Sequence, residues 1–327
     1  MGMNGLGAEP VLARWGGGGE DAMVEVRGFD AAGFLRIAPT DGGAGEALLP
    51  ASEVGDLRFI FSAAYQEAQL RVSIGRPAEA LHLLQRELPA YVPYAVLENS
   101  NVPGAVRLYL RLLQQNRQWP EAVAVGASLT GSRDAPALSA DVFDLVESLV
   151  RVGRIEDASW LLGRISLESD LAYVVDVARI ASQLRRMGHW PEARNIYLRL
   201  MSQEPQPGAT PWSALAAYCA WHLDEPLPAV ELVEAHSEQS ASAWEGLLGL
   251  MRGRVALAMN DPVAALDVLS EALINAPANS EWRLEITTLL ATAYAARGDT
   301  ELAQRLKAEL ARLYPDSRWI LPESKNH

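Results

Sequence analysis

Cysteine and basic residues are scarce in this sequence, and long apolar runs are missing. Cys219 is the one cysteine among 327 residues, which excludes an intramolecular disulfide framework and a cysteine-rich zinc site. Lys and Arg number 28 against 41 Asp and Glu, for a net charge of −13, so nucleic acids and anionic membranes are unfavourable partners. No segment approaches the roughly 20 apolar residues of a membrane helix, and we expect no direct membrane insertion.

The first 60 residues differ in composition from the rest. They hold 13 of the 25 glycines and contain short β-prone segments separated by turn signals. The segment from Leu49 to Val54 resembles the short turn before the last strand of an SH3-like barrel. We therefore predict a flexible tail over residues 1–10 and a small β-rich module over residues 11–60. Its five expected strands are Val11–Trp15, Val24–Arg27, Phe34–Ile37, Glu46–Leu49 and Leu57–Phe61.

From residue 60 onward the sequence repeats itself. The tetrapeptide Trp-Pro-Glu-Ala occurs at residues 119–122 and again at residues 190–193, and its alanine serves as an anchor for finding equivalent positions. Successive anchors are 35 to 42 residues apart, close to the period of about 34 residues of a helix–turn–helix repeat. The anchors are Ala80, Ala122, Ala158, Ala193, Ala229, Ala265 and Ala303.

Other positions keep the same register. Small residues prevail twelve positions before the anchor, where two helices must approach closely: Ala68, Leu110, Val146, Ala181, Ala217, Gly253 and Ala291. Five positions before the anchor, most repeats have a residue that tolerates the left-handed conformation of a helix C-cap: Gly75, Gly153, Gly188, Asn260 and Gly298. Arg117 and Glu225 depart from this turn pattern. Prolines twelve positions after three anchors end the second helix of their repeats: Pro205, Pro277 and Pro315.

This arrangement resembles the tetratricopeptide repeat (TPR) family over residues 61–315, with a C-terminal tail at residues 316–327. The resemblance implies a mainly α fold, a TPR-like α-solenoid of about seven helix–turn–helix repeats that follows the β module. It also implies a concave groove, lined by the first helices, that binds a protein or peptide. Because the ends of a solenoid need covering, we expect the β module to cover the outer edge of the first repeat.

Catalytic and metal-binding patterns are weak. Cys219 and His222 lie three residues apart on one expected helix, a spacing that lets two side chains reach one metal, but two further ligands are absent nearby. Their apolar surroundings favour a buried thiol. The five histidines are scattered, and no nucleophile motif accompanies them. We therefore predict that the chain is not an enzyme and has no cofactor and no metal site.

The candidate partner contacts are groove positions that combine arginine with aromatic residues, the types enriched at protein interfaces. Arg107 and Arg111 lie one helical turn apart and would present two guanidinium groups to a carboxylate-rich segment. A solvated arginine pair is the alternative. Tyr91 and Tyr94, in a longer connection between the first two repeats, either make further contacts or pack back on the repeats. The full set of groove candidates is Tyr65, Arg107, Arg111, Phe143, Arg185, Tyr218, Trp221 and Arg254.

The predicted function is a non-enzymatic scaffold or adaptor with a protein or peptide partner. The alternative is a structural or assembly component of a bacterial cell envelope complex that self-associates or supports a membrane machine. A third option is the regulatory part of an enzyme on another chain. Residues 1–9 carry no export signal as written. Residues 314–317 resemble the sequence that commonly ends a repeat in bacterial envelope proteins of this family. This favours the periplasm if a signal peptide was removed; otherwise we expect the cytoplasm.

Overall fold

The computed structural model divides the chain into two compact units, residues 1–170 and 171–327. The predicted tails fall almost entirely outside the residues that the structure describes, and the predicted division into tails, module and repeats stays a prediction. Within the described part of the chain, no helix is long and apolar enough to cross a membrane. The described residues are 10–16, 22–30, 32–40, 45–54, 57–130, 139–165, 171–203, 211–235 and 245–315.

The first unit begins with an antiparallel sheet at the five places where strands are predicted. Buried and more exposed residues alternate along β1 and in the middle of β2, so that one face of the sheet is buried while the other is open to solvent. The strands pair in the order β4-β3-β2-β1-β5. A short 3₁₀ helix, Ala51–Glu53, precedes the last strand, where the SH3-like resemblance places a turn. The strands are β1 (Val11–Trp15), β2 (Ala22–Phe29), β3 (Phe34–Pro39), β4 (Ala47–Pro50) and β5 (Leu57–Phe59).

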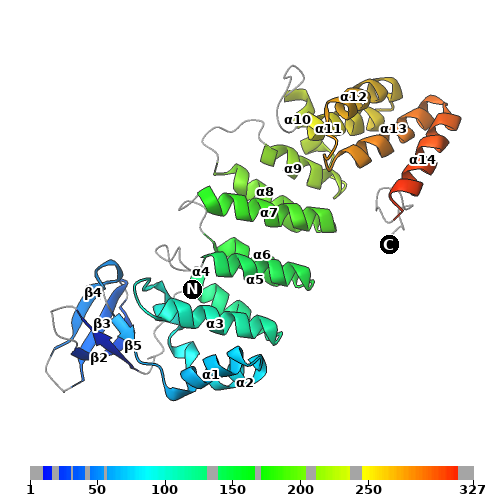
Figure 1. Cartoon of the computed structure of the whole chain (residues 1–327). Helices are drawn as coiled ribbons and strands as arrows, with labels where there is room; N and C mark the ends of the chain where they lie inside the picture. The colour runs from blue at the N-terminus through cyan, green and yellow to red at the C-terminus, as the bar shows by residue number, and fades with distance from the viewer. Residues whose placement is uncertain are drawn as a thin grey trace. The chain divides into compact units, whose positions relative to one another are not determined.

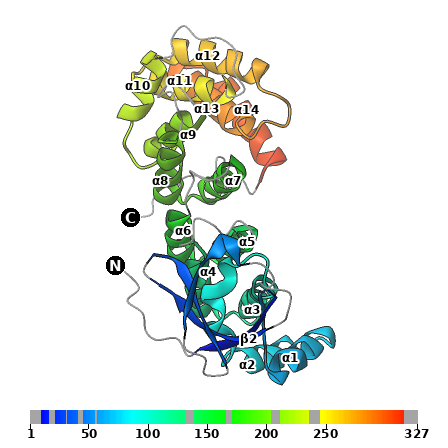
Figure 2. The same cartoon turned by 90° about the vertical axis from the view of Figure 1, so that its left-hand side faces the viewer.

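Helix pairs make up the rest of both units (Figures 1 and 2). In the first unit they are α1 (Ala63–Ser73), α2 (Pro77–Leu84), α3 (Val102–Gln115), α4 (Trp119–Thr130), α5 (Ser139–Arg151) and α6 (Ile155–Arg164). In the second unit they are α7 (Leu171–Met187), α8 (Trp190–Met201), α9 (Pro211–Trp221), α10 (Leu227–Ala235), α11 (Glu245–Ala258), α12 (Pro262–Asn275), α13 (Arg283–Arg297) and α14 (Thr300–Leu313). Two 3₁₀ helices, η2 (Leu88–Ala90) and η3 (Val92–Val96), connect α2 to α3.

The seven helix pairs confirm the register read from the sequence. Each anchor alanine lies near the start of the second helix and is at most 3% exposed. In the α11–α12 pair the small residue of the first helix, Gly253, lies against the second helix. At Gly253 the approach is so close that a β-carbon would lie 2.3 Å from the side chain of Leu269. The predicted fold class, a mainly α arrangement of TPR-like repeats with a small N-terminal β module, is therefore correct.

The turn inside each described helix pair has the same backbone conformation. The residue five positions before the anchor has a positive φ in every pair: Gly75, Arg117, Gly153, Gly188, Asp224, Asn260 and Gly298. The next residue then donates its N–H to a carbonyl five residues earlier, as Arg76 does to Arg71, which is the Schellman hydrogen bond. The expectation that the turns at Arg117 and Glu225 depart from the pattern is wrong, because Arg117 and Asp224 adopt the left-handed conformation although neither is glycine.

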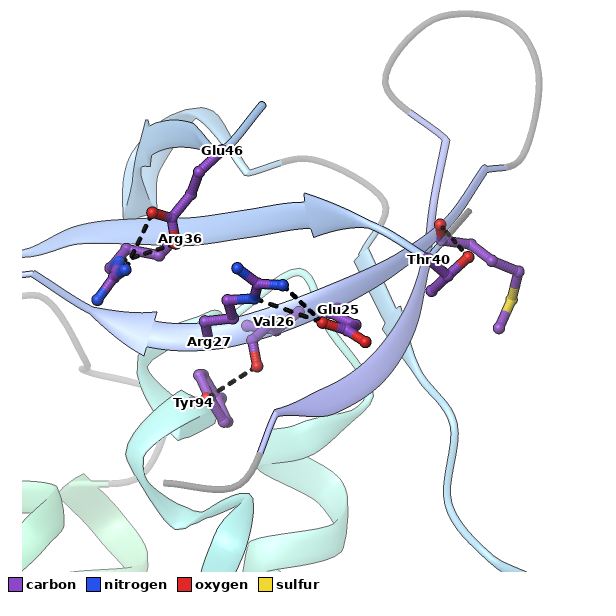
Figure 3. A network of polar contacts seen from close by, with 8 residues as sticks. Glu25, Val26, Arg27, Arg36, Thr40, Glu46 and Tyr94 are labelled. Atoms are coloured by element: carbon purple, nitrogen blue, oxygen red, sulfur yellow. Dashed lines mark hydrogen bonds and ion pairs between the residues drawn. The ribbon is translucent and has the colours of Figure 1, made fainter. Parts of the chain in front are cut away.

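The sheet packs on the connection between the first two repeats. The ring of Tyr94 contacts Phe29 and Phe59, and Phe59 also contacts Tyr91, with ring centroids 5.1 to 5.9 Å apart. The Tyr94 hydroxyl donates to the carbonyl of Val26 at 3.5 Å (Figure 3). Tyr91 is 7% and Tyr94 is 1% exposed. Of the two alternatives for these tyrosines, contact with a partner is therefore wrong, since both are buried against the sheet.

Asn101, just before α3, fixes the edge strand of the sheet to the same connection. Its Oδ1 accepts from the N–H of Phe59, and its Nδ2 donates to the carbonyl of Phe59, both at 2.9 Å. The side-chain amide thus pairs with β5 as a neighbouring strand would. With the sheet held here, Leu70 of α1 and Ile74, the residue that follows α1, remain 54% exposed. The expectation that the β module covers the outer edge of the first repeat is wrong.

Glycine at a left-handed turn that now has a side chain should stabilise the protein. Arg117→Gly removes the steric cost of a β-carbon in this conformation, so we expect a gain of up to about 1 kcal/mol in the free energy of unfolding. The reverse change, Gly153→Ala, should cost about 1 kcal/mol. Chemical denaturation measures both values. A loss of stability in Arg117→Gly would contradict the assigned conformation.

Alkaline pH should weaken the contact between the sheet and the connection. Burial raises the pKa of Tyr94 to about 12, whereas an unfolded tyrosine releases its proton near pH 10. Between these values the unfolded state binds fewer protons, so stability falls as the pH rises from about 10 to about 12. Tyr94→Phe has no such proton and should lose less stability over this interval. Thermal melts from pH 9 to 12 test this, and equal slopes in both proteins would contradict it.

Candidate partner-binding surface

Two of the predicted contacts, Arg107 and Arg111, lie on the exposed side of α3, next to α5 of the following repeat. The Nε of Arg107 donates to both carboxylate oxygens of Asp141, at 3.1 and 2.9 Å. Arg111 is exposed, and among the described residues its side chain has no ion pair or hydrogen bond. Asp144, one turn beyond Asp141, is exposed as well. We call these four residues the α3–α5 face, which has arginines on one helix and aspartates on the other.

Phe143 and Tyr65, the other candidates in the first unit, have packing contacts. Phe143 is 2% exposed. Tyr65 lies against Phe61 with ring centroids 4.4 Å apart, and Phe61 in turn contacts Tyr91 at 4.9 Å. A partner role stays a prediction for both residues, but neither belongs to the α3–α5 face.

In the second unit, candidates from two first helices meet at one buried carboxylate. Glu285 of α13 is 2% exposed. Its Oε2 accepts from the hydroxyl of Tyr218 on α9 at 2.7 Å, and its Oε1 accepts from the Nε of Arg254 on α11 at 3.1 Å. Burial raises the pKa of Tyr218, and the Glu285 carboxylate raises it further, so the hydroxyl keeps the proton that it donates. The carboxylate is therefore satisfied inside the unit.

Arg185 of α7 is buried beside this group. It is 2% exposed, and its Nη2 donates to Glu281 at 2.7 Å. Its guanidinium lies 4.5 Å from the ring centroid of Trp282 and 5.7 Å from that of Tyr218. Such contacts are needed because burying an unpaired charge costs several kcal/mol. Arg185 is thus engaged by α9 and by the residues just before α13, all within its own unit.

Two neighbouring rings, Trp221 at the end of α9 and His222 directly after it, complete the cluster. The guanidinium of Arg254 lies 5.9 Å from the ring centroid of Trp221, and its Nη2 is 3.4 Å from Nε2 of His222. The His222 ring stacks on Trp190 with centroids 4.1 Å apart. The structure therefore brings together four predicted contacts and engages them with one another and with the last repeat: Arg185, Tyr218, Trp221 and Arg254.

The residues that satisfy this cluster are not among the candidates predicted from the sequence: Glu281, Trp282 and Glu285. A usable signal exists for Glu285, because it lies 18 positions before its anchor. A single carboxylate at a position that is otherwise small, polar or apolar indicates a buried charge with a partner. The other six repeats have no charged residue at this position: Ser62, Gly104, Ala140, Val175, Pro211 and Leu247.

Cys219 lies in the core of the second unit. It is fully buried, and this burial raises the pKa of its thiol to about 12, so the thiol is protonated at neutral pH. His222 is stacked on Trp190 and lies beside Arg254. In the described ranges, no group of three or more His, Cys, Asp and Glu residues has the arrangement to hold a metal ion.

No family model matches the chain, and no curated protein matches it. Among solved structures, a tetratricopeptide repeat protein from Parabacteroides merdae is 11% identical, with a TM-score of 0.38, and covers 79% of this chain and 96% of its own. BtubC (BKLC) from P. vanneervenii is 16% identical, with a TM-score of 0.27, and covers 79% of this chain and 96% of its own. These similarities are too distant to bear on function. The fold assignment depends on the helix pairs themselves.

Removing the charge of Glu285 should destabilise the second unit. Glu285→Gln leaves Arg254 buried without its counter-charge, and breaking a buried ion pair on one side costs about 3–5 kcal/mol. Glu301→Gln is the control, because the pair of Glu301 with Arg305 is exposed and should contribute less than about 1 kcal/mol. Urea denaturation compares the two variants. A loss below about 1 kcal/mol for Glu285→Gln would show that the cluster is not a stabilising element.

Proposed function

We propose that the chain is a non-enzymatic protein-interaction scaffold and that a partner segment binds the α3–α5 face of the first unit. The Arg107–Asp141 ion pair is the main support for this proposal. In this pair a guanidinium of the face already binds a carboxylate, at 2.9 and 3.1 Å. Arg111 is one turn further along and exposed, so it can bind a carboxylate of a partner in the same way.

In the second unit, the predicted contact residues on the first helices are less available to a partner. Arg185 and Tyr218 are buried, and the side chain of Arg254 is only 12% exposed. Each is engaged with Glu281 or Glu285. A partner would have to displace these buried pairs, which costs several kcal/mol before any contact forms. We therefore place the interaction on the first unit, a narrower site than the full set of groove candidates.

The charges of the α3–α5 face define the chemistry of the partner. Arg111 favours a carboxylate against α3, and Asp144 favours a cation against α5. A segment that presents both charges, spaced to meet neighbouring helices, complements this face. A segment of one sign alone gains one contact and meets repulsion at the other. The proposed partner is thus a protein segment of mixed charge. The envelope-assembly alternative stays a prediction without an observation that favours it.

Reversing one charge of this face should weaken binding. Peptides selected from a random library on the immobilised protein provide the ligand, and fluorescence anisotropy measures its affinity. Arg111→Glu should lower the affinity tenfold or more, since a close charge pair of about 1.4 kcal/mol or more is replaced by repulsion. The melting temperature should be nearly unchanged, because exposed substitutions usually stay within about 0.5 kcal/mol.

Arg86→Glu is the matched control, since Arg86 is an exposed arginine that follows α2 and lies outside the α3–α5 face. It should bind the selected peptides as the unchanged protein does. Asp144→Lys should weaken the same peptides. If Arg111→Glu and Asp144→Lys both retain full affinity, the α3–α5 face is not the site.

A further inference from the structure

The sheet of the first unit places two arginines directly opposite each other. In the register of β1 with β5, Arg14 pairs with Arg58. Both side chains are exposed and alternate with buried neighbours, so they lie on the outer face of the sheet. Residues opposite each other in an antiparallel pair have β-carbons about 5 Å apart. The side chains of two arginines therefore start from neighbouring positions on the outer face of the sheet.

Neither arginine of this pair has a counter-charge in the part of the chain that the structure describes. The other two arginines of the same sheet face do have one. Arg27 pairs with Glu25 at 3.0 Å, and Arg36 pairs with Glu46 at 2.9 Å (Figure 3). Like charges directly opposite on a sheet destabilise it. The chain as a whole has a net charge of −13, so two adjacent cations without a counter-charge among the described residues are unusual in it. An anionic group of another molecule would offset their repulsion.

Exposed apolar side chains lie next to the arginine pair. Met23 is opposite Arg14 on β2 and is 39% exposed. Leu12 and Ile60 lie two positions further along the strands, where the N–H of Ile60 donates to the carbonyl of Leu12 at 2.9 Å. They are 44% and 38% exposed. We call these three residues and the two arginines the β1–β5 face.

We propose that the β1–β5 face is a second interaction surface, which docks an acidic protein segment that also carries apolar side chains. A carboxylate between the guanidinium groups of Arg14 and Arg58 would accept hydrogen bonds from both and offset their repulsion. Apolar side chains of the same segment would cover Leu12, Met23 and Ile60. This surface belongs to the sheet and is separate from the α3–α5 face, so one partner can occupy it while another binds the repeats.

The test uses the full chain and a fluorescein-labelled peptide of alternating Glu and Leu, with fluorescence anisotropy at low salt. The variant Arg14→Gln with Arg58→Gln should bind the peptide at least fivefold more weakly. The matched control is Arg27→Gln with Arg36→Gln, which removes two arginines from the same face. Because those two are already paired, the control should bind within twofold of the unchanged protein. A peptide of alternating Lys and Leu should not bind.

Thermal melts give an independent measurement. Arg58→Gln relieves the repulsion and should raise the melting temperature, more so at 20 mM than at 500 mM salt, whereas Arg36→Gln should not raise it. Unchanged peptide affinity in the Arg14 and Arg58 variant, or a lower melting temperature in Arg58→Gln, would overturn the proposal. Two other results would also overturn it: competition by inorganic phosphate as strong as by the peptide, or self-association that Arg58→Gln abolishes.

Discussion

The close approach of two helices at each anchor alanine is the constraint on which the rest of this structure depends. Each anchor alanine is buried with almost no exposed area, and at Gly253 not even a β-carbon fits against Leu269 of the second helix. This contact fixes which side of each first helix points away from its partner helix. The exposed stripe of α3, with Arg107 and Arg111, is a consequence of it.

The repeat register made most of the fold predictable from sequence, because it constrains residue size at positions that recur seven times. The turns were predicted less well. Glycine is favoured at the left-handed position but not required, since the helices on both sides hold the turn closed even at Arg117, at a cost of about 1 kcal/mol. The sheet was predictable from the alternation of apolar and polar residues within each strand, which is a local pattern. The packing of the sheet on Tyr91 and Tyr94 involves residues far along the chain, so no local pattern predicts it.

The same distinction explains the candidate surfaces. The register correctly brings Arg185, Tyr218 and Arg254 toward one region, because equivalent positions of neighbouring helices share a face. It does not reveal whether that region is open. Arg185 is bound by Glu281, which is 96 positions later in the chain, and sequence periodicity has no information at that range. The α3–α5 face was predictable in its arginines, while its aspartates were found only from the structure.

The amide of Asn101 that closes the sheet edge has a consequence for protein synthesis. The five strands leave the ribosome before Tyr91, Tyr94 and Asn101, because the chain emerges from its N-terminus. While the 42 positions from Phe59 to Asn101 are being synthesised, the edge strand β5 lacks the side chain that pairs with it. An open edge strand is a template for pairing with another chain. The nascent module is thus most prone to association with other nascent chains during this interval, and emergence of the connection ends it.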